Sequence, residues 1–213
     1  MNEIQNNINN IKKNINSNRE ISILAVTKTR TLDEIYSAIQ GGILHIGENY
    51  IEEAYEKYPH ITSDTVKKHF IGHLQSNKVK RAVEIFDVIQ TVDSIKLLKK
   101  IDSFSKKIDV MIQVNTSPGS SYHGIYFEEF FEFYEKVLEL PLQNVTITGL
   151  MTIASKNDPR TCFKRLFTMK QKTNLDVLSM GMSHDYEIAI EEGATMIRLG
   201  TKIFGERKTI INR

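Results

Sequence analysis

The chain has 213 residues, of which 40% are hydrophobic and 25% are charged, and this average globular composition excludes a largely disordered chain. Its 28 basic and 26 acidic residues give a formal net charge of +2, which argues against nucleic-acid binding through a basic surface. No run approaches the roughly 18 apolar residues that a membrane span needs. The single cysteine, Cys162, cannot form an internal disulfide bond and fits a reducing compartment. We therefore expect a cytoplasmic protein.

The chain begins with an amphipathic segment. Ile4, Ile8, Ile11 and Ile15 recur at the spacing of one helix face. A signal peptide would need a continuous apolar stretch, which this segment lacks. We therefore expect residues 1–18 to form a helix that covers one end of the fold.

Eight short apolar runs follow, and longer segments with helical spacing separate them. The runs are Ile21–Val26, Ile43–Ile46, His69–Ile71, Val88–Val92, Val110–Val114, Val145–Leu150, Val177–Met180 and Met196–Leu199. Strands that alternate with helices predict βαβ units and a parallel sheet. Eight strands is the number that closes a (β/α)8 barrel. An open doubly wound sheet is the rival, but no G-x-G-x-x-G turn follows the first run.

The length of the chain fits one trimmed barrel, since such barrels typically have about 250 residues. No linker rich in proline, glycine or serine divides the sequence. We therefore expect one α/β domain over residues 1–213, a single-domain (β/α)8 TIM-like barrel with an extra N-terminal helix and no second domain.

Barrels of this kind bind ligands at the carboxyl ends of their strands. Lys28 follows the first run, where an amine near apolar walls could attack a carbonyl and form a Schiff base. A solvated loop lysine is the simpler interpretation of this position alone. Ser183 follows the seventh run, and Gly200 and Thr201 follow the eighth, where barrels commonly bind phosphate. An ordinary helix cap and a tight turn are the alternatives there.

Arg198 lies within the eighth run, and an inward-pointing guanidinium needs a partner. Glu48 is the simplest partner, and a ligand atom is the other. A lysine that faces a phosphate site favours a ligand that carries both an aldehyde and a phosphate. Pyridoxal 5′-phosphate (PLP) is the leading candidate.

Six segments, in order along residues 25–205, carry a family resemblance. They are Ala25–Thr29, Gly47–Asn49, His69–Lys78, Gly149–Thr152, Met180–Asp185 and Arg198–Gly205. With them the chain resembles the pyridoxal phosphate homeostasis proteins, the bacterial YggS and human PROSC type. The resemblance implies a barrel similar to the N-terminal domain of alanine racemase, with PLP held covalently on Lys28. The other cofactor contacts that it implies are Asn49 near the cofactor, Arg198 at the pyridine nitrogen, and Ser183, Gly200 and Thr201 at the phosphate, with Met180 nearby.

One loop departs from the family pattern. Pro118 and Gly119 replace a Gly-Glu pair, and Tyr122, followed by His123, stands where the family has a lysine.

The resemblance favours binding over catalysis. An arginine does not give a proton to the pyridine nitrogen, so the ring is a poor electron sink. A racemase of this fold also takes an acid/base group from a second domain, which we do not expect here. We therefore expect a monomeric carrier that binds PLP and passes it to apo-enzymes, and that binds neither nucleic acid nor membrane. A minimal PLP-dependent amino-acid racemase and a PLP-free, lysine-dependent aldolase are the alternatives.

We expect no metal site from the sequence. His45, His69 and His73 form no recognised metal-binding motif, such as H-E-x-x-H.

Overall fold

The computed structural model describes residues 1–15, 17–117 and 122–206. The strands are β1 (Ser22–Val26), β2 (His45–Glu48), β3 (Lys67–Phe70), β4 (Val88–Val92), β5 (Ile108–Asn115), β6 (Ile125–Tyr126), β7 (Val145–Met151), β8 (Val177–Ser179) and β9 (Met196–Leu199). The helices are α1 (Glu3–Asn14), α2 (Leu32–Gln40), α3 (Ile51–Lys57), α4 (Val79–Ile85), α5 (Ile95–Asp102), α6 (Phe130–Leu138), α7 (Pro159–Gln171), α8 (Tyr186–Glu191) and α9 (Thr201–Phe204), with 3-10 turns η1 (Tyr58–His60) and η2 (Ser76–Lys78).

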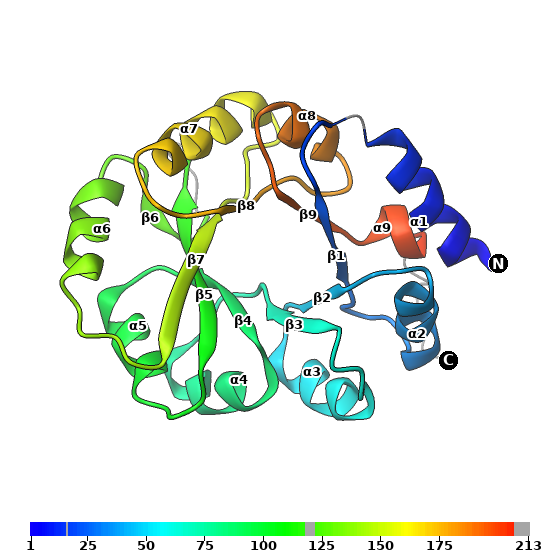
Figure 1. The fold of residues 1–213 in the computed structure, drawn as a ribbon, viewed down its shortest axis with the longest axis horizontal. Coiled ribbons are helices and arrows are strands. Elements are labelled where there is room, and N and C mark those ends of the chain that lie inside the picture. The colour runs from blue at the N-terminus through cyan, green and yellow to red at the C-terminus, as the bar shows by residue number, and fades with distance from the viewer. Residues whose placement is uncertain (16, 118–121, 207–213) are drawn as a thin grey trace, which may run out of the picture.

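Eight strands form a closed parallel barrel inside a ring of helices (Figure 1). The strand order is β4-β3-β2-β1-β9-β8-β7-β5, and pairing of β4 with β5 closes the barrel. Each of the eight apolar runs contributes one of these strands, so the prediction of a (β/α)8 barrel is confirmed. The short strand β6 was not expected, and it extends the sheet beside the carboxyl end of β5 through the pair Val114 and Ile125.

The helix expected over residues 1–18 spans Glu3–Asn14, and it lies in the ring beside α2 and α9 (Figure 1). It does not lie across an end of the barrel. Within residues 200–206, the described part of the segment after β9, the chain forms the four-residue helix α9, and α1 packs against it and α2. Ile8 and Ile11 are buried there, and Ile8 touches the turn that ends α2 at Gly41.

The core has two parts. The larger part lies between the barrel and the helices, and it includes Cys162 of α7. The smaller part fills the barrel and consists of Leu24, Ile71, Val88, Met111, Met151 and Met196. Burial of both apolar sets holds the strand ends in fixed positions, and these ends carry the candidate site.

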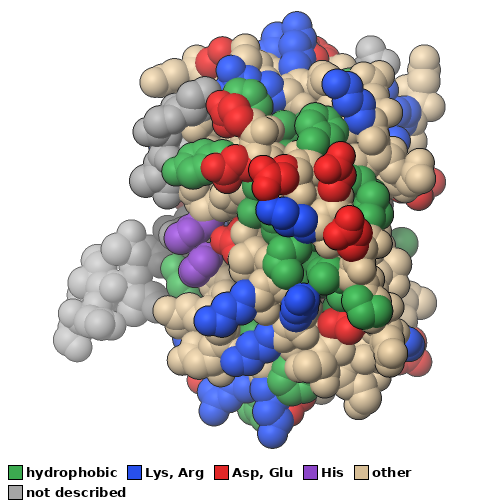
Figure 2. Space-filling model, turned by 90° about the vertical axis from the view of Figure 1, so that its left-hand side faces the viewer, with side chains coloured by type: hydrophobic (Ala, Val, Ile, Leu, Met, Phe, Trp, Pro, Cys, Tyr) green, Lys and Arg blue, Asp and Glu red, His purple; other side chains and the backbone are tan. Residues whose placement is uncertain are grey.

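The surface carries charges of both signs. Figure 2 shows acidic and basic side chains side by side over one flank of the barrel. This agrees with the near-balance of 28 basic and 26 acidic residues in the sequence. Within the described part of the chain, none of the helices has the length and apolar character that crossing a bilayer requires.

Candidate functional site

A cavity of about 200 Å³ lies at the carboxyl ends of the barrel strands. It collects residues from the carboxyl ends of six strands, β1, β2, β3, β7, β8 and β9. Its lining consists of Val26, Lys28, Asn49, Ile71, Met151, Ile153, Met182, Ser183, His184, Arg198, Gly200 and Thr201. The structure thus brings together six of the candidate residues that the sequence placed at separate strand ends.

The turn that carries Lys28 is fixed on both sides. The Thr27 hydroxyl contacts the Gly47 carbonyl at 3.1 Å and a Glu48 carboxylate oxygen at 2.9 Å. Thr29 has φ 63°, an uncommon left-handed conformation for a β-branched residue, and its N–H donates to Glu53. Side-chain hydrogen bonds therefore hold both neighbours of the half-buried Lys28 in place.

Glu48 lies fully buried behind this turn. Burial raises the pKa of its carboxyl group, and the nearby Lys57 ammonium, at 3.3 Å, opposes that rise. Lys57 also donates to the Thr27 carbonyl at 3.1 Å. The interpretation that Glu48 pairs with Arg198 is therefore wrong, because this carboxylate is bound to Thr27 and Lys57.

Neutral acceptors hold the Arg198 guanidinium instead. One nitrogen donates to the Ser179 carbonyl at 2.7 Å and to the Ser179 hydroxyl at 2.9 Å, and the other donates to the Thr152 carbonyl at 2.8 Å. Burial lowers the pKa of Arg198 to about 10, while the Asp185 carboxylate opposes the change. At neutral pH the cavity wall thus contains a buried cation with a fixed orientation.

Hydrogen-bond donors gather at the Ser183 side of the cavity. The N–H groups of Gly200 and Lys202 point toward the Ser183 hydroxyl at 3.3 and 3.5 Å. Gly181, at φ 91°, makes the turn before Ser183, and the Asp185 carboxylate accepts the Met182 N–H at 2.6 Å. A hydroxyl next to backbone N–H groups is an arrangement that suits a small anion such as a phosphate.

Asn49 places a polar atom in the wall of the cavity. Its side-chain oxygen is buried and has no hydrogen-bond partner within the part of the chain that the structure describes. Because an unsatisfied buried acceptor is unfavourable, this atom fits a ligand that donates a hydrogen bond. The donors at Ser183, the orphaned Asn49 oxygen and the half-buried Lys28 together fit a small ligand with an anionic end and a polar ring.

Met180 has a different position from the other candidates. Its side chain is fully buried in the core between barrel and helices and does not line the cavity. The loop residues Pro118 and Gly119 lie outside the described residues.

The apolar wall of the cavity was not predicted from the sequence. This wall consists of Val26, Ile71, Met151, Ile153 and Met182, and His184 joins it from the exposed side. Their position at the carboxyl ends of apolar runs is the signal that could have identified them, since any residue there faces either the ligand or the core.

A hydrogen-bonded chain crosses the barrel interior below Arg198. The Ser179 hydroxyl donates to the Gln90 side-chain oxygen at 2.7 Å, and the Gln90 amide nitrogen contacts His69 Nδ1 at 2.9 Å. An amide nitrogen only donates, so the proton of His69 sits on Nε2, which lies 2.9 Å from His45 Nδ1. These hydrogen bonds fix the orientation of the Ser179 hydroxyl, which accepts a hydrogen bond from Arg198.

The buried His69 predicts a loss of stability in mild acid. Burial holds the pKa of His69 well below 6.5, whereas the unfolded chain takes up this proton near pH 6.5. The stabilisation is therefore complete above pH 6.5 and is lost as the pH falls below it, by up to about 1.4 kcal/mol per pH unit. Urea unfolding at several pH values measures this loss.

Two variants separate the contribution of His69 from other titrations. His69→Gln should flatten the pH dependence, and His60→Gln, at an exposed histidine, should leave it unchanged. NMR signals of the His69 ring that titrate near pH 6.5 in the folded protein would contradict the prediction.

Known proteins share this barrel and much of its sequence. The family model described as alanine racemase, N-terminal domain, matches residues 1–208. Alanine racemase from Clostridium difficile 630 superposes with a TM-score of 0.79 at 15% identity, over 97% of this chain and 57% of the racemase, a likeness of fold alone.

Two relatives are closer in sequence. A pyridoxal phosphate homeostasis protein from Vibrio alginolyticus is 38% identical over 97% of this chain and 99% of its own length. PipY from Synechococcus elongatus PCC7942, whose structure has PLP bound, is 31% identical with a TM-score of 0.85, over 95% of this chain and 100% of PipY. This chain belongs to the pyridoxal phosphate homeostasis protein family.

Proposed function

We propose that this chain binds PLP as a Schiff base between the cofactor's aldehyde and Lys28, and that it serves intracellular PLP homeostasis without robust catalysis. The single observation that carries the proposal is the cavity itself, in which a half-buried lysine and a group of anion-binding donors share one small space. The PLP-bound structure of the relative PipY supports the choice of cofactor.

Each polar residue of the cavity has a role in this proposal. Ser183, Gly200 and Thr201 would hold the phosphate through a hydroxyl and backbone N–H groups. Asn49 would contact the ring through its buried oxygen, and Arg198 would lie at the pyridine nitrogen. PLP supplies an electrophilic aldehyde that condenses with amines.

Arg198 favours retention of the cofactor over carbanion chemistry. Its guanidinium stays protonated at neutral pH and donates to Ser179 and Thr152, so it gives no proton to a bound ring nitrogen. A ring without that proton is a weaker electron sink. The buried apolar side chains of Ile71 and Met151 line the same cavity as Lys28.

Reversible binding is what a homeostasis role requires. A Schiff base exchanges with another amine, so an amine from a recipient can take the place of Lys28 on the cofactor. We propose that apo PLP-dependent enzymes are such recipients. We further propose that the chain acts as a monomer in the cytoplasm, where its one buried cysteine, Cys162, stays reduced.

Reductive trapping tests the proposal. The chain is loaded with PLP, reduced with borohydride, digested and mapped by mass spectrometry. We expect a yellow protein before reduction and one reduced PLP per chain, attached at Lys28. A colourless chain with no gain in mass after reduction would overturn the proposal, and a chain that instead binds sugar phosphates would be the lysine-dependent aldolase.

A second measurement separates the carrier from a minimal racemase. The PLP-loaded chain is incubated with common amino acids in heavy water, and the α-proton is followed by NMR. If the chain is a carrier, the α-proton stays in place over hours, even when the protein is present in an amount equal to that of the amino acid. Fast exchange of the α-proton would instead establish racemase chemistry.

A further inference from the structure

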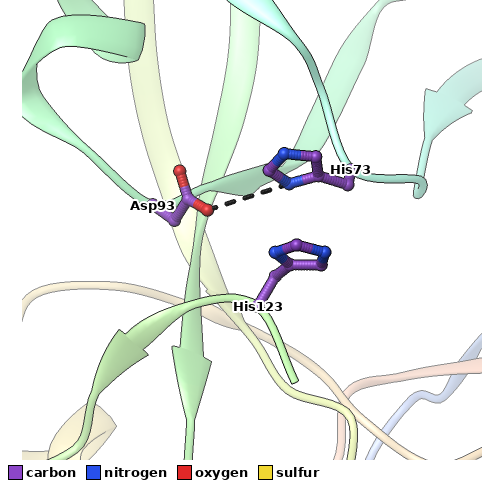
Figure 3. Close-up of side chains that lie close together, drawn as sticks. All are labelled: His73, Asp93 and His123. Atoms are coloured by element: carbon purple, nitrogen blue, oxygen red, sulfur yellow. Dashed lines mark ion pairs between the residues drawn. The ribbon is translucent and has the colours of Figure 1, made fainter. Parts of the chain in front are cut away.

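Two histidines and an aspartate meet at the carboxyl end of the barrel, outside the lining of the PLP cavity. These residues are His73, Asp93 and His123 (Figure 3). One ligand atom from each lies within 4.8 Å of the other two. His73 Nδ1 is 4.0 Å from an Asp93 carboxylate oxygen, and the two imidazole rings stack with centroids 3.9 Å apart.

The three side chains come from three different parts of the barrel. His73 follows β3, Asp93 follows β4, and His123 precedes β6. Because they are 20 or more positions apart in the sequence, their spacing matches no metal motif. Only closure of the barrel brings the ends of these segments together.

Buried polar side chains fix the backbone beside each histidine. Thr91 donates to the carbonyl of Gly72, next to His73, at 2.6 Å. Gln113 donates to the carbonyl of His123 itself at 2.9 Å. Thr91 and Gln113 are buried residues of β4 and β5, so the barrel wall holds both histidines at set positions. The fold itself therefore holds His73 and His123 close together, and contact between their two exposed rings is not the only cause of their proximity.

We propose that His73, Asp93 and His123 form a binding site for a divalent transition-metal ion, with Zn²⁺ as the metal. Two imidazole nitrogens and one carboxylate oxygen are ligands that Zn²⁺ prefers, and three protein ligands leave a fourth position open. Mg²⁺ and Ca²⁺ prefer sites made of oxygen ligands, so this set of side chains discriminates against them.

Small side-chain rotations complete the site. Zinc bonds of about 2.1 Å place tetrahedral ligand atoms roughly 3.4 Å apart, closer than the 4.0 Å between His73 Nδ1 and the Asp93 carboxylate oxygen. A metal ion also lies in the plane of each imidazole that binds it, whereas these rings are stacked at 15° to each other. The rings must therefore turn about χ2, a broad torsion in histidine. His73 and His123 are exposed, so the solvent side of the two rings leaves room for this rotation.

Zinc titration of the full chain without an affinity tag tests the site. The protein is stripped with a chelator and titrated with Zn²⁺ against a chromophoric competitor, both with and without PLP, because PLP itself can bind metals. We expect one Zn²⁺ per chain in both forms and no competition from Mg²⁺. His73→Ala, Asp93→Ala and His123→Ala should each weaken binding by at least about tenfold, since even indirect contacts to a metal contribute this much.

His60→Ala is the matched control, because His60 is an exposed histidine outside the cluster. It should bind Zn²⁺ as tightly as the unchanged chain. Circular dichroism shows whether each variant is folded, and the exposure of both cluster histidines makes folding the expected result. Absence of Zn²⁺ binding, or unchanged binding in the folded His73→Ala and His123→Ala variants, would overturn the proposal.

Discussion

Replacing Lys28 with alanine is expected to abolish borohydride-trapped PLP, from one per chain to none. A Schiff base needs an amine, and Lys28 is the one lysine among the residues that line the cavity in the described part of the chain. The donors at Ser183 and Gly200 remain in this variant, so weaker, non-covalent binding of PLP should persist. Intact mass after reduction measures the covalent fraction, and equilibrium dialysis measures the rest.

Lys78→Ala is the matched control for this experiment. Lys78 is a surface lysine that pairs with Glu52 at 2.7 Å and does not line the cavity. This variant should trap PLP as the unchanged chain does. If Lys28→Ala still gains one reduced PLP at a different lysine, the assignment of Lys28 is wrong.

Replacing Gly72 with alanine should destabilise the fold severely. A Cβ atom there would lie 2.0 Å from the backbone oxygen of Asn49 and 2.8 Å from its carbonyl carbon. Because both groups are backbone, no side-chain rotation relieves the clash, and the Thr91 hydroxyl also holds the Gly72 carbonyl. We expect a loss of about 3 kcal/mol or more, which is a large part of a typical stability of about 5–15 kcal/mol.

Urea and thermal unfolding without PLP measure this loss. A change of about 3 kcal/mol corresponds to a melting temperature lower by roughly 6–12 °C for a chain of this size. Since Asn49 must move to make room, PLP binding should weaken as well. A melting temperature within about 2 °C of the unchanged protein would contradict the prediction.

Gly200→Ala is the control for the Gly72 substitution. The backbone of Gly200 has φ −109°, which alanine tolerates, and the nearest atom to an added Cβ lies at 3.7 Å. The stability of the PLP-free protein should therefore change by less than about 0.5 kcal/mol. The added methyl group adjoins the ligand space, however, so PLP retention should fall without a loss of stability.

Local patterns in the sequence were enough to predict the barrel. Runs such as Val88–Val92 are rich in β-branched residues and are buried at every position, as is typical of strands covered on both faces, and helical segments separate them. The boundaries differ by a few residues, since β2 begins at His45 and not at Ile43. The short strand β6 escaped prediction because two residues carry no periodic signal.

The polar residues that line the cavity could also be predicted from the sequence. Lys28, Ser183 and Gly200 follow strands, and all parallel strands of a barrel end at the same face. Their shared cavity therefore followed from topology before any distance was known. The hydrogen-bond partner of Arg198 could not be predicted from topology. The choice between Glu48 and the Ser179 carbonyl depends on the direction in which each side chain points.

The sequence by itself thus determined the fold class, the family and the strand ends that carry the cavity, because apolar periodicity and strand order are local properties of the chain. Only the tertiary structure decided which polar groups pair inside the barrel, where α1 packs, and that His73, Asp93 and His123 meet. These features depend on contacts between residues far apart in sequence, which form when apolar burial closes the barrel and sets its register.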